Sequence, residues 1–352
     1  MRNPITIGLI AAAIATCGVA IAQDAPQAGP LDELKTKPAL TDEERAALKE
    51  WLTQRISAVV NNNAPQAAAE LRANYDGTDS FKEAYVAIAV ELVKPVVPRA
   101  DVAPAAQLVA LLGSYRDMKT FDLLLDALKD KRPAVRSASA VALRGLQSKI
   151  AAAGGGEFAR SVAALRDAAK VETSAPALRL MYRALDYATL PADVNTLAAA
   201  VLDILEARSK KYRGDQTPAW AADRPGLRLA GKLAGRLNET DKDRLIAAAA
   251  RILRAGVLRY AAEKLDEVED DSASADRIEL RNATEYLIVE AENLLASLLG
   301  VSNKSDRPNV AQKLTSERDP IAMKTEMNRW ADMLQTRMAE DFHTFEADDA
   351  AP

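Results

Sequence analysis

A four-residue pattern, Pro-x-(Val/Leu)-Arg, occurs three times in this chain and constrains its fold more than any other feature. It covers residues 133–136, 176–179 and 225–228, so that successive copies start 43 and 49 residues apart. These spacings are near the period of about 40–47 residues that is typical of two-helix repeats. A proline in the first turn of a helix needs no backbone partner, so each copy is expected to start a helix. The repetition therefore predicts helix pairs stacked side by side, as in an α-solenoid.

Helical periodicity continues along nearly the whole chain from Thr41 onward. Thr41 and Glu44 have the spacing of a capping box, and no segment shows the alternation of a half-buried strand. The predicted fold class is therefore all-α. Besides a helix after Thr41, helices are expected at 79–93, 104–112, 119–129, 133–150, 157–171, 175–188, 191–209, 226–237, 240–265, 274–299 and 320–342. The expected N-cap residues are Asp79, Ser174, Thr240, Ser274 and Asp319.

One unit of the chain, residues 108–146, resembles a HEAT repeat of the phycobilisome-lyase-like kind, and weaker resemblance covers 160–188 and 223–237. The matching residues are Leu112-Gly113, Leu124, Leu125 and Leu128 in the first helix, the turn 130–136, and Ala142-Leu143 in the second helix. The resemblance implies an extended helical surface that binds proteins. It also implies that Asp130 and Arg136 have structural roles, with a binding role as the alternative.

The N-terminal 22 residues have the features of a secretory signal peptide. Arg2 precedes an uncharged apolar run, and the sequence Ala20-Ile21-Ala22 predicts cleavage after Ala22. Cys17 lies in a sequence similar to a bacterial lipobox, so a lipid-anchored envelope protein is an alternative. Residues 23–40 mix Pro, Gly and charge without a period and are expected to form a flexible leader.

The composition excludes several classes of chemistry. The chain has only one His and one Cys, so it barely has the imidazoles and thiols that a His-based zinc site or a catalytic triad needs, and a net charge of −4 disfavours a nucleic-acid binder. The acidic run 263–276 lacks the order of an EF-hand, so a solvated loop is expected there. We expect no catalytic, cofactor or metal site. The alternative is a carboxylate-dependent hydrolase of the helical toroid type.

Two groups of residues are candidate contact surfaces. Basic residues at the end of the 191–209 helix and just after it could contact an anion, or could only complement the helix dipole: Arg208, Lys210, Lys211 and Arg213. Apolar residues at three- and four-residue steps in the C-terminal helix could bind a partner, or could cover the last repeat as a cap: Met323, Met327, Trp330, Leu334 and Met338.

The expected organisation is a HEAT-like helical array over 41–300, a C-terminal helical cap over 301–345 and an acidic disordered tail over 346–352. The expected function is that of an exported, non-catalytic scaffold for protein–protein interaction in the bacterial periplasm or at the cell surface. Its partner would be an unidentified protein. Membrane contact is expected only if Cys17 is lipidated.

Overall fold

The computed structural model describes residues 31–62, 64–187, 193–213, 220–269, 272–302, 305 and 307–337. Within these ranges the protein is all-α and contains no strand. The α-helices are α1 (Asp32–Lys35), α2 (Asp42–Asn62), α3 (Pro65–Ala73), α4 (Asp79–Val93), α5 (Val102–Ser114), α6 (Phe121–Ala127), α7 (Pro133–Ala153), α8 (Gly155–Val171), α9 (Ala175–Leu185), α10 (Val194–Ser209), α11 (Arg224–Leu233), α12 (Glu239–Ala262), α13 (Ala275–Leu298), α14 (Val310–Ser316) and α15 (Pro320–Gln335).

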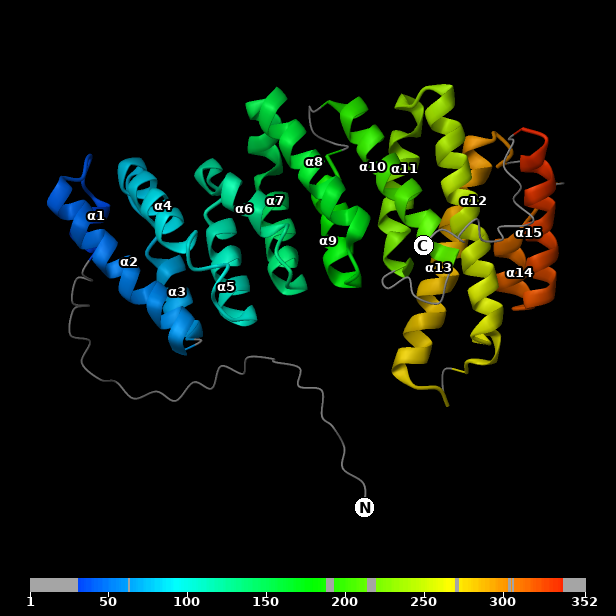
Figure 1. The fold of residues 1–352 in the computed structure, drawn as a ribbon, viewed down its shortest axis with the longest axis horizontal. Coiled ribbons are helices and arrows are strands. Elements are labelled where there is room, and N and C mark those ends of the chain that lie inside the picture. The colour runs from blue at the N-terminus through cyan, green and yellow to red at the C-terminus, as the bar shows by residue number, and fades with distance from the viewer. Residues whose placement is uncertain are drawn as a thin grey trace, which may run out of the picture.

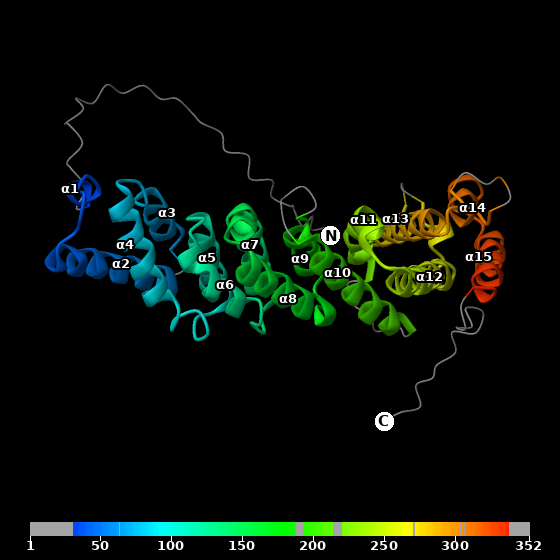
Figure 2. The same ribbon diagram turned by 90° about the horizontal axis from the view of Figure 1, so that it is seen from above.

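The helices form an elongated two-layer stack (Figure 1). Seen from above, α5, α7, α9, α11 and α13 follow one another in one row, and α6, α8, α10 and α12 follow one another in a second row (Figure 2). Helices of the same row contact each other, as α5 does with α7 and α8 does with α10. Across the two rows, α6 contacts α7, α8 contacts α9, α10 contacts α11, and α12 contacts α13. This arrangement is consistent with the predicted α-solenoid.

The three copies of the repeated motif occupy equivalent places. Pro133, Pro176 and Pro225 lie in the first turns of α7, α9 and α11, which are consecutive helices of one row. The missing N–H of a proline is no loss in the first turn, where backbone N–H groups have no intrahelical acceptor. The motif therefore marks the start of three consecutive helices in this row.

Small residues allow neighbouring helices of this row to approach closely. A Cβ atom placed on Gly113 of α5 would lie 2.3 Å from the Cβ of Ala142 of α7, so no side chain fits there. In the same way, a Cβ on Gly226 of α11 would lie 2.5 Å from the ring of Tyr182 of α9. Since Leu112-Gly113 and Ala142-Leu143 are among the residues that resemble a HEAT repeat, that part of the resemblance coincides with a real helix–helix contact.

Most of the expected capping residues lie at the starts of their helices, with two exceptions. The Thr41 N–H donates to Glu44 Oε2 over 2.9 Å, and the Glu44 N–H donates back to Thr41 Oγ1 over 3.3 Å, which is the predicted capping box. The expected N-caps Asp79 and Thr240 are wrong, because each lies inside its helix. The caps are Thr78 and Asn238, which come earlier in the chain and accept the N–H of Phe81 and Asp241. Ser274 and Asp319 accept as expected, and Ser174 is an N-cap without a side-chain hydrogen bond.

Part of the expected leader is folded. Residues 31–40 contain α1, and the side chains of Leu31, Leu34 and Leu40 are buried. The Thr78 N–H donates to the carbonyl oxygen of Lys35 over 2.8 Å, which fixes this segment to the start of α4. The prediction of a flexible leader is therefore wrong for 31–40, because three leucines among charged residues suffice to dock a short segment. Residues 1–30, with Cys17 and the predicted cleavage after Ala22, lie outside the described residues, as does the predicted tail, 346–352.

Candidate functional site

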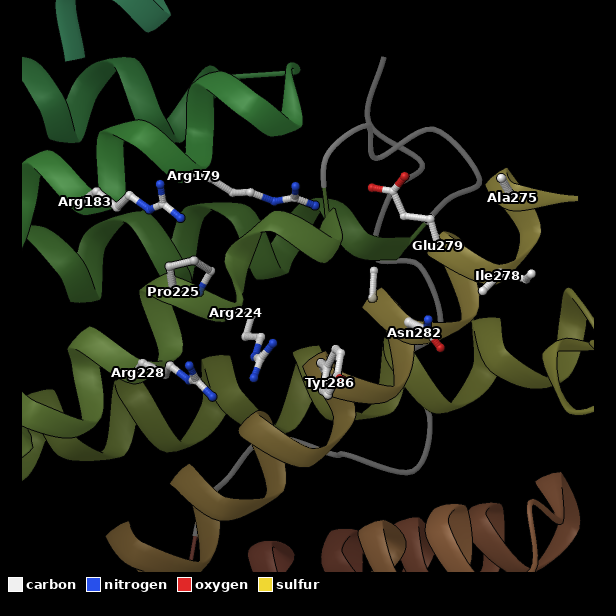
Figure 3. A pocket seen from close by; sticks show the side chains of 11 residues that line it. Arg179, Arg183, Arg224, Pro225, Arg228, Ala275, Ile278, Glu279, Asn282 and Tyr286 are labelled. Atoms are coloured by element: carbon white, nitrogen blue, oxygen red, sulfur yellow. The ribbon is translucent and has the colours of Figure 1, made fainter. Parts of the chain in front are cut away.

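A groove of about 740 Å³ opens where α9, α11 and α13 meet (Figure 3). Its lining residues come from three helices of the same row and are dominated by arginine: Arg179, Arg183, Arg224, Pro225, Arg228, Ala275, Ile278, Glu279, Asn282, Ala283 and Tyr286. We call this feature the arginine groove. Its volume lies within the range of about 300–1,000 Å³ that is usual for ligand pockets.

The four arginines form two matching pairs. Arg179 and Arg183 are four residues apart on α9, and Arg224 and Arg228 are four residues apart on α11. Residues at this spacing lie on the same face of a helix, so each pair projects toward the groove as Figure 3 shows. Arg179 and Arg228 are the arginines of the second and third copies of the repeated motif. The repeat therefore delivers one arginine of each pair to a common site.

The pair on α11 is held by α13. Glu290 Oε2 lies 2.6 Å from Arg228 Nε and 3.6 Å from Arg224 Nε. The guanidinium of Arg224 also lies over the ring of Tyr286, 4.3 Å from its centroid, as in a cation–π contact. These contacts neutralise part of the charge on α11 and fix the orientation of both side chains.

The pair on α9 has no such partner. Arg179 is half-buried and Arg183 is exposed, and within the described residues neither guanidinium forms an ion pair or a hydrogen bond. Glu279, the one carboxylate among the described lining residues, is exposed on the opposite wall of the groove. Among the described residues, therefore, no carboxylate pairs with the positive charge on the α9 side of the arginine groove.

In the first copy of the motif, the arginine forms an ion pair within the protein. Arg136 of α7 donates to both carboxylate oxygens of Glu172, with Nε–Oε2 and Nη2–Oε1 distances of 2.6 Å. Burial disfavours the charge of Glu172, but Arg136 and the N–H groups of Thr173 and Ser174 outweigh burial and lower the pKa of Glu172. Arg136 is therefore a structural residue, as the resemblance implied.

At the next junction, before α11, side chains other than the motif arginine bind the buried acid. Asp223, which directly precedes α11, is fully buried, and it accepts from Tyr182 Oη over 2.5 Å and from Arg208 Nε over 2.7 Å. Burial and the charge of Asp223 raise the pKa of Tyr182, so its hydroxyl stays protonated and donates. Asp223 is thus occupied, and Arg179, the counterpart of Arg136, is left facing the arginine groove.

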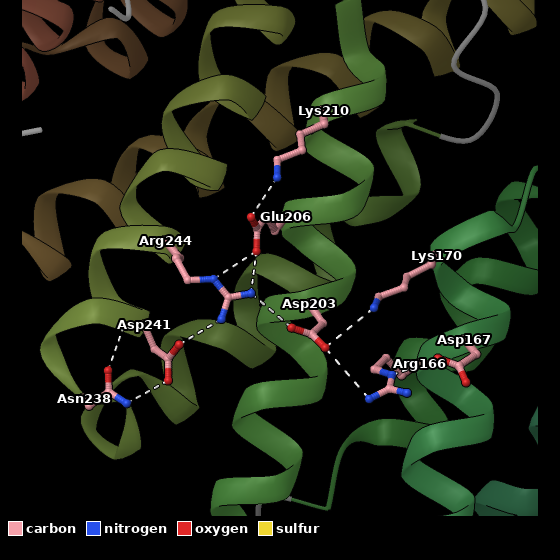
Figure 4. Close-up of polar contacts among 9 residues, drawn as sticks. All are labelled: Arg166, Asp167, Lys170, Asp203, Glu206, Lys210, Asn238, Asp241 and Arg244. Carbon is pink, nitrogen blue, oxygen red and sulfur yellow. Dashed lines mark hydrogen bonds and ion pairs between the residues drawn. The ribbon is translucent and has the colours of Figure 1, made fainter. Parts of the chain in front are cut away.

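In the second row, charged side chains of α8, α10 and α12 form ion pairs with one another (Figure 4). Arg244 of α12 lies 2.5 Å from Glu206 and 3.2 Å from Asp203, both on α10. Asp203 in turn lies 3.6 Å from Lys170 of α8 and 3.9 Å from Arg166 of α8. These ion pairs connect three consecutive helices, so this face has a structural explanation that the α9 arginines lack.

The predicted anion contact at the end of α10 is wrong for Arg208. Its side chain is 3% exposed, and besides Asp223 it donates to the carbonyl oxygen of Glu172 over 2.9 Å. Burial opposes its charge, but Asp223 outweighs burial and raises the pKa of Arg208. Sequence could not reveal this burial, because Asp223 lies 15 residues away.

The other basic residues of that group do not form one surface with Arg208. Lys210 is exposed and pairs with Glu206 at 2.8 Å. Lys211 is exposed and donates to the carbonyl oxygen of Lys170 over 3.1 Å. The side chain of Arg213 lies outside the described residues.

Of the two interpretations of the apolar stripe in the C-terminal helix, the structure supports the cap and not the partner-binding face, where it describes these residues. Met323, Met327, Trp330 and Leu334 of α15 are all buried, and Met338 lies outside the described residues. Trp330 Nε1 donates over 2.8 Å to Glu292 of α13, whose carboxylate also accepts the first N–H groups of α14. An apolar stripe on a helix has the same spacing whether it packs inside the protein or on a partner, so the sequence could not separate the two.

The α13 wall of the arginine groove escaped the sequence analysis for a clear reason. The spacing of Arg179 and Arg183, and of Arg224 and Arg228, is visible in the chain once helices are assumed. Tyr286 and Glu290 are about 60 residues further on in α13, and no local pattern connects them with α11. Only the stacking of α13 on α11 brings the third wall to the site.

The described residues also bear on metal and membrane contacts. In these ranges no three His, Cys, Asp or Glu side chains gather in a way that could hold a metal ion. None of the described helices is both long and apolar enough to cross a membrane. Compared with known proteins, the chain matches no protein-family model, and no curated protein or solved structure is significantly similar to it.

Proposed function

We propose that this protein is an exported, non-catalytic scaffold of HEAT-like helix pairs that binds another protein through the arginine groove. The observation that carries the proposal is the pair Arg179 and Arg183. Both line a groove that three helices build, and within the described residues neither has an ion-pair partner. Stacked helices typically serve as extended binding surfaces, which is an argument from fold and not from chemistry.

The physical reason is that an unpaired guanidinium in a groove can still gain from pairing. Arg136, Arg208 and Arg244 are already bound to carboxylates of the protein itself. Arg179 and Arg183 can bind a carboxylate from outside without breaking an ion pair with any described residue. The groove wall also gives a partner an apolar contact, because Tyr286 is 54% exposed. Aromatic and arginine side chains together are typical of the residues that dominate protein interfaces.

The cellular place is part of the proposal and depends on the first 22 residues. We propose that the signal peptide is cleaved after Ala22 and that the mature chain acts in the periplasm or at the cell surface. Intact-mass spectrometry of protein isolated from the envelope fraction tests this. A mature N-terminus at Gln23 supports cleavage, whereas an acylated Cys17 supports the lipid-anchored alternative.

Site-specific photo-cross-linking tests the binding surface. A benzoylphenylalanine replaces Tyr286 in the groove, and the control places it at Ile321 of α15, which is 76% exposed. We expect one protein to be cross-linked at 286 and not at 321, and to be lost when Arg179→Gln/Arg183→Gln is added. The same products at both positions, or products that survive the double substitution, would contradict binding through the arginine groove.

The alternative of a carboxylate-dependent hydrolase gains no specific support from the site. Glycoside hydrolases use two carboxyl groups on either side of the scissile bond. The described lining of the arginine groove has one, Glu279, and Glu290 behind it is paired with arginine.

A further inference from the structure

We propose that the arginine groove binds an acidic peptide segment, and that a carboxylate of that segment is held by Arg179 and Arg183. This inference rests on the proposed function and names the chemistry that the partner must present. It concerns the side of the groove that α9 forms, where the described residues provide no acid for the two arginines.

A contact of the expected kind, one carboxylate between two arginines four residues apart, already exists within the protein. On α11 one carboxylate oxygen of Glu290 lies between Arg228 and Arg224, at 2.6 Å and 3.6 Å from their Nε atoms. Arg179 and Arg183 have the same four-residue spacing one helix earlier in the row. A carboxylate from a ligand can therefore bridge Arg179 and Arg183 as Glu290 bridges Arg224 and Arg228, one helical turn further along relative to the motif arginine.

The residue type favours a planar oxyanion. All four cations of the lining are arginines, and none is lysine. The guanidinium presents several N–H donors in a fixed plane that matches a carboxylate or a phosphate, whereas the lysine ammonium acts as a point charge. The groove is thus suited to geometric recognition and not only to charge attraction.

Charge and size favour a peptide over a nucleic acid. The whole chain carries a net charge of −4, and Glu279 and Glu290 lie in or beside the groove. A nucleic acid brings a continuous row of phosphates, which usually requires a basic stripe and a basic domain. A groove of about 740 Å³ instead suits a short segment with one or two acidic residues.

The remaining lining residues match a peptide as well. Ile278, Ala283 and Tyr286 of α13 supply apolar surface, and Asn282 supplies an amide that can both donate to and accept from a peptide backbone. A segment in which acidic and apolar residues alternate would place its carboxylates on α9 and its apolar side chains on α13.

Fluorescence anisotropy with defined probes tests the inference. The probe is a fluorescein-labelled peptide, Glu-Leu-Glu-Leu-Glu-Leu, and the comparison probes are the Gln-Leu-Gln-Leu-Gln-Leu peptide and a labelled six-nucleotide oligothymidine. Inorganic phosphate is added as a competitor. The protein is the full chain without the predicted signal peptide.

Two variants with the same change in charge separate the site from general electrostatics. Arg179→Gln/Arg183→Gln is expected to raise the dissociation constant for the acidic peptide about tenfold, because two charge-assisted contacts are lost. Lys94→Gln/Arg99→Gln alters two exposed cations just beyond α4 and is expected to change it less than twofold. A third variant, Glu290→Gln, releases Arg228 and is expected to tighten binding about threefold, which a misfolded protein could not do.

Each outcome decides the matter. Tighter binding of the acidic peptide than of both comparison probes, with these responses to the variants, supports the inference. Tighter binding of the oligothymidine, displacement by millimolar phosphate alone, equal effects of both double variants, or no binding of the acidic peptide overturns it. If the cross-link at position 286 still depends on Arg179 and Arg183 while the peptide fails to bind, the scaffold function stands and only the ligand chemistry is wrong.

Discussion

Removal of the Glu172 carboxylate is the sharpest test of how α9 is held in place. The carboxylate is fully buried, bonds Arg136 through two contacts of 2.6 Å, and accepts the N–H groups of Thr173 and Ser174 over 2.9 Å and 2.8 Å. Glu172→Ala leaves a largely buried guanidinium and two N–H groups without their acceptor. Since Arg136 is 15% exposed and reaches some water, the expected loss lies near the lower end for a broken buried pair, about 3 kcal/mol.

The interaction itself is isolated by a double-mutant cycle. Arg136→Ala is expected to cost about 3 kcal/mol as well, because it leaves a buried carboxylate with only the two backbone donors. The double variant is expected to cost about 4 kcal/mol, which gives a coupling energy of about 2 kcal/mol. Glu91→Ala, which breaks the exposed pair of Lys49 and Glu91, serves as the control and should cost less than about 0.5 kcal/mol.

The measurement combines urea unfolding with hydrogen exchange of the amides in α7 and α9. Exchange is needed because stacked helix pairs can open locally, below the free energy of global unfolding. A loss below about 1 kcal/mol for Glu172→Ala, or a coupling energy below about 0.5 kcal/mol, would show that this pair does not hold α9.

The same carboxylate predicts a pH dependence with a definite sign. The pKa of Glu172 is lowered from its ordinary value of 4.5 in the folded protein. The unfolded chain therefore binds the proton more tightly, and stability rises with pH in this window. The contribution of Glu172 is fully present above pH 4.5 and is lost as the pH falls through the lower, folded pKa. The difference in stability between the wild type and Glu172→Ala should accordingly shrink below pH 4.5.

Three further substitutions test other contacts of the stack. Gly113→Ala should destabilise the protein by about 1–3 kcal/mol in urea unfolding, because its Cβ would lie 2.3 Å from that of Ala142, and Ala142→Gly should restore part of the loss. Arg208→Met should cost about 3–5 kcal/mol, since it leaves Asp223 buried without its cation, and an unchanged urea midpoint would refute that role. Glu292→Gln should speed hydrogen exchange in α14 by about tenfold, because the amide cannot accept all three N–H groups that the carboxylate accepts, and unchanged protection would contradict this.

Helical periodicity and the motif prolines predicted several helices well. The bounds 79–93 agree with α4, and the proline of each motif copy lies in the first turn of its helix. Two short helices, Pro65–Ala73 and Val310–Ser316, were missed, since a short helix gives only a weak periodic signal, although the equally short α6 lies within the predicted 119–129. The folded segment 31–40 was missed for a related reason: its leucines gain their stability from α4, which the local sequence does not contain.

Candidate sites were harder to predict because a charge or an apolar stripe does not reveal its partner. Arg208 has the features of a surface cation in the sequence, and only the fold shows that Asp223 neutralises it. Trp330 similarly belongs to a stripe that would suit a partner, but Glu292 and the neighbouring helices cover it. Arg179 was noticed as part of a repeat and not as a candidate binding residue, because only three dimensions show that no described carboxylate pairs with it.

The repeat itself explains how the arginine groove can arise without a change of fold. In the first copy Arg136 is bound by Glu172, and the arginine stabilises the junction of α7, α8 and α9. In the second copy the corresponding acid, Asp223, is bound by Arg208 and Tyr182, so the junction is stabilised without Arg179. Because this junction does not depend on the motif arginine, Arg179 lines the arginine groove without an ion-pair partner among the described residues. The groove therefore lies at the junction where the buried ion pair is Arg208–Asp223 instead of a pair that uses the motif arginine, as Arg136–Glu172 does.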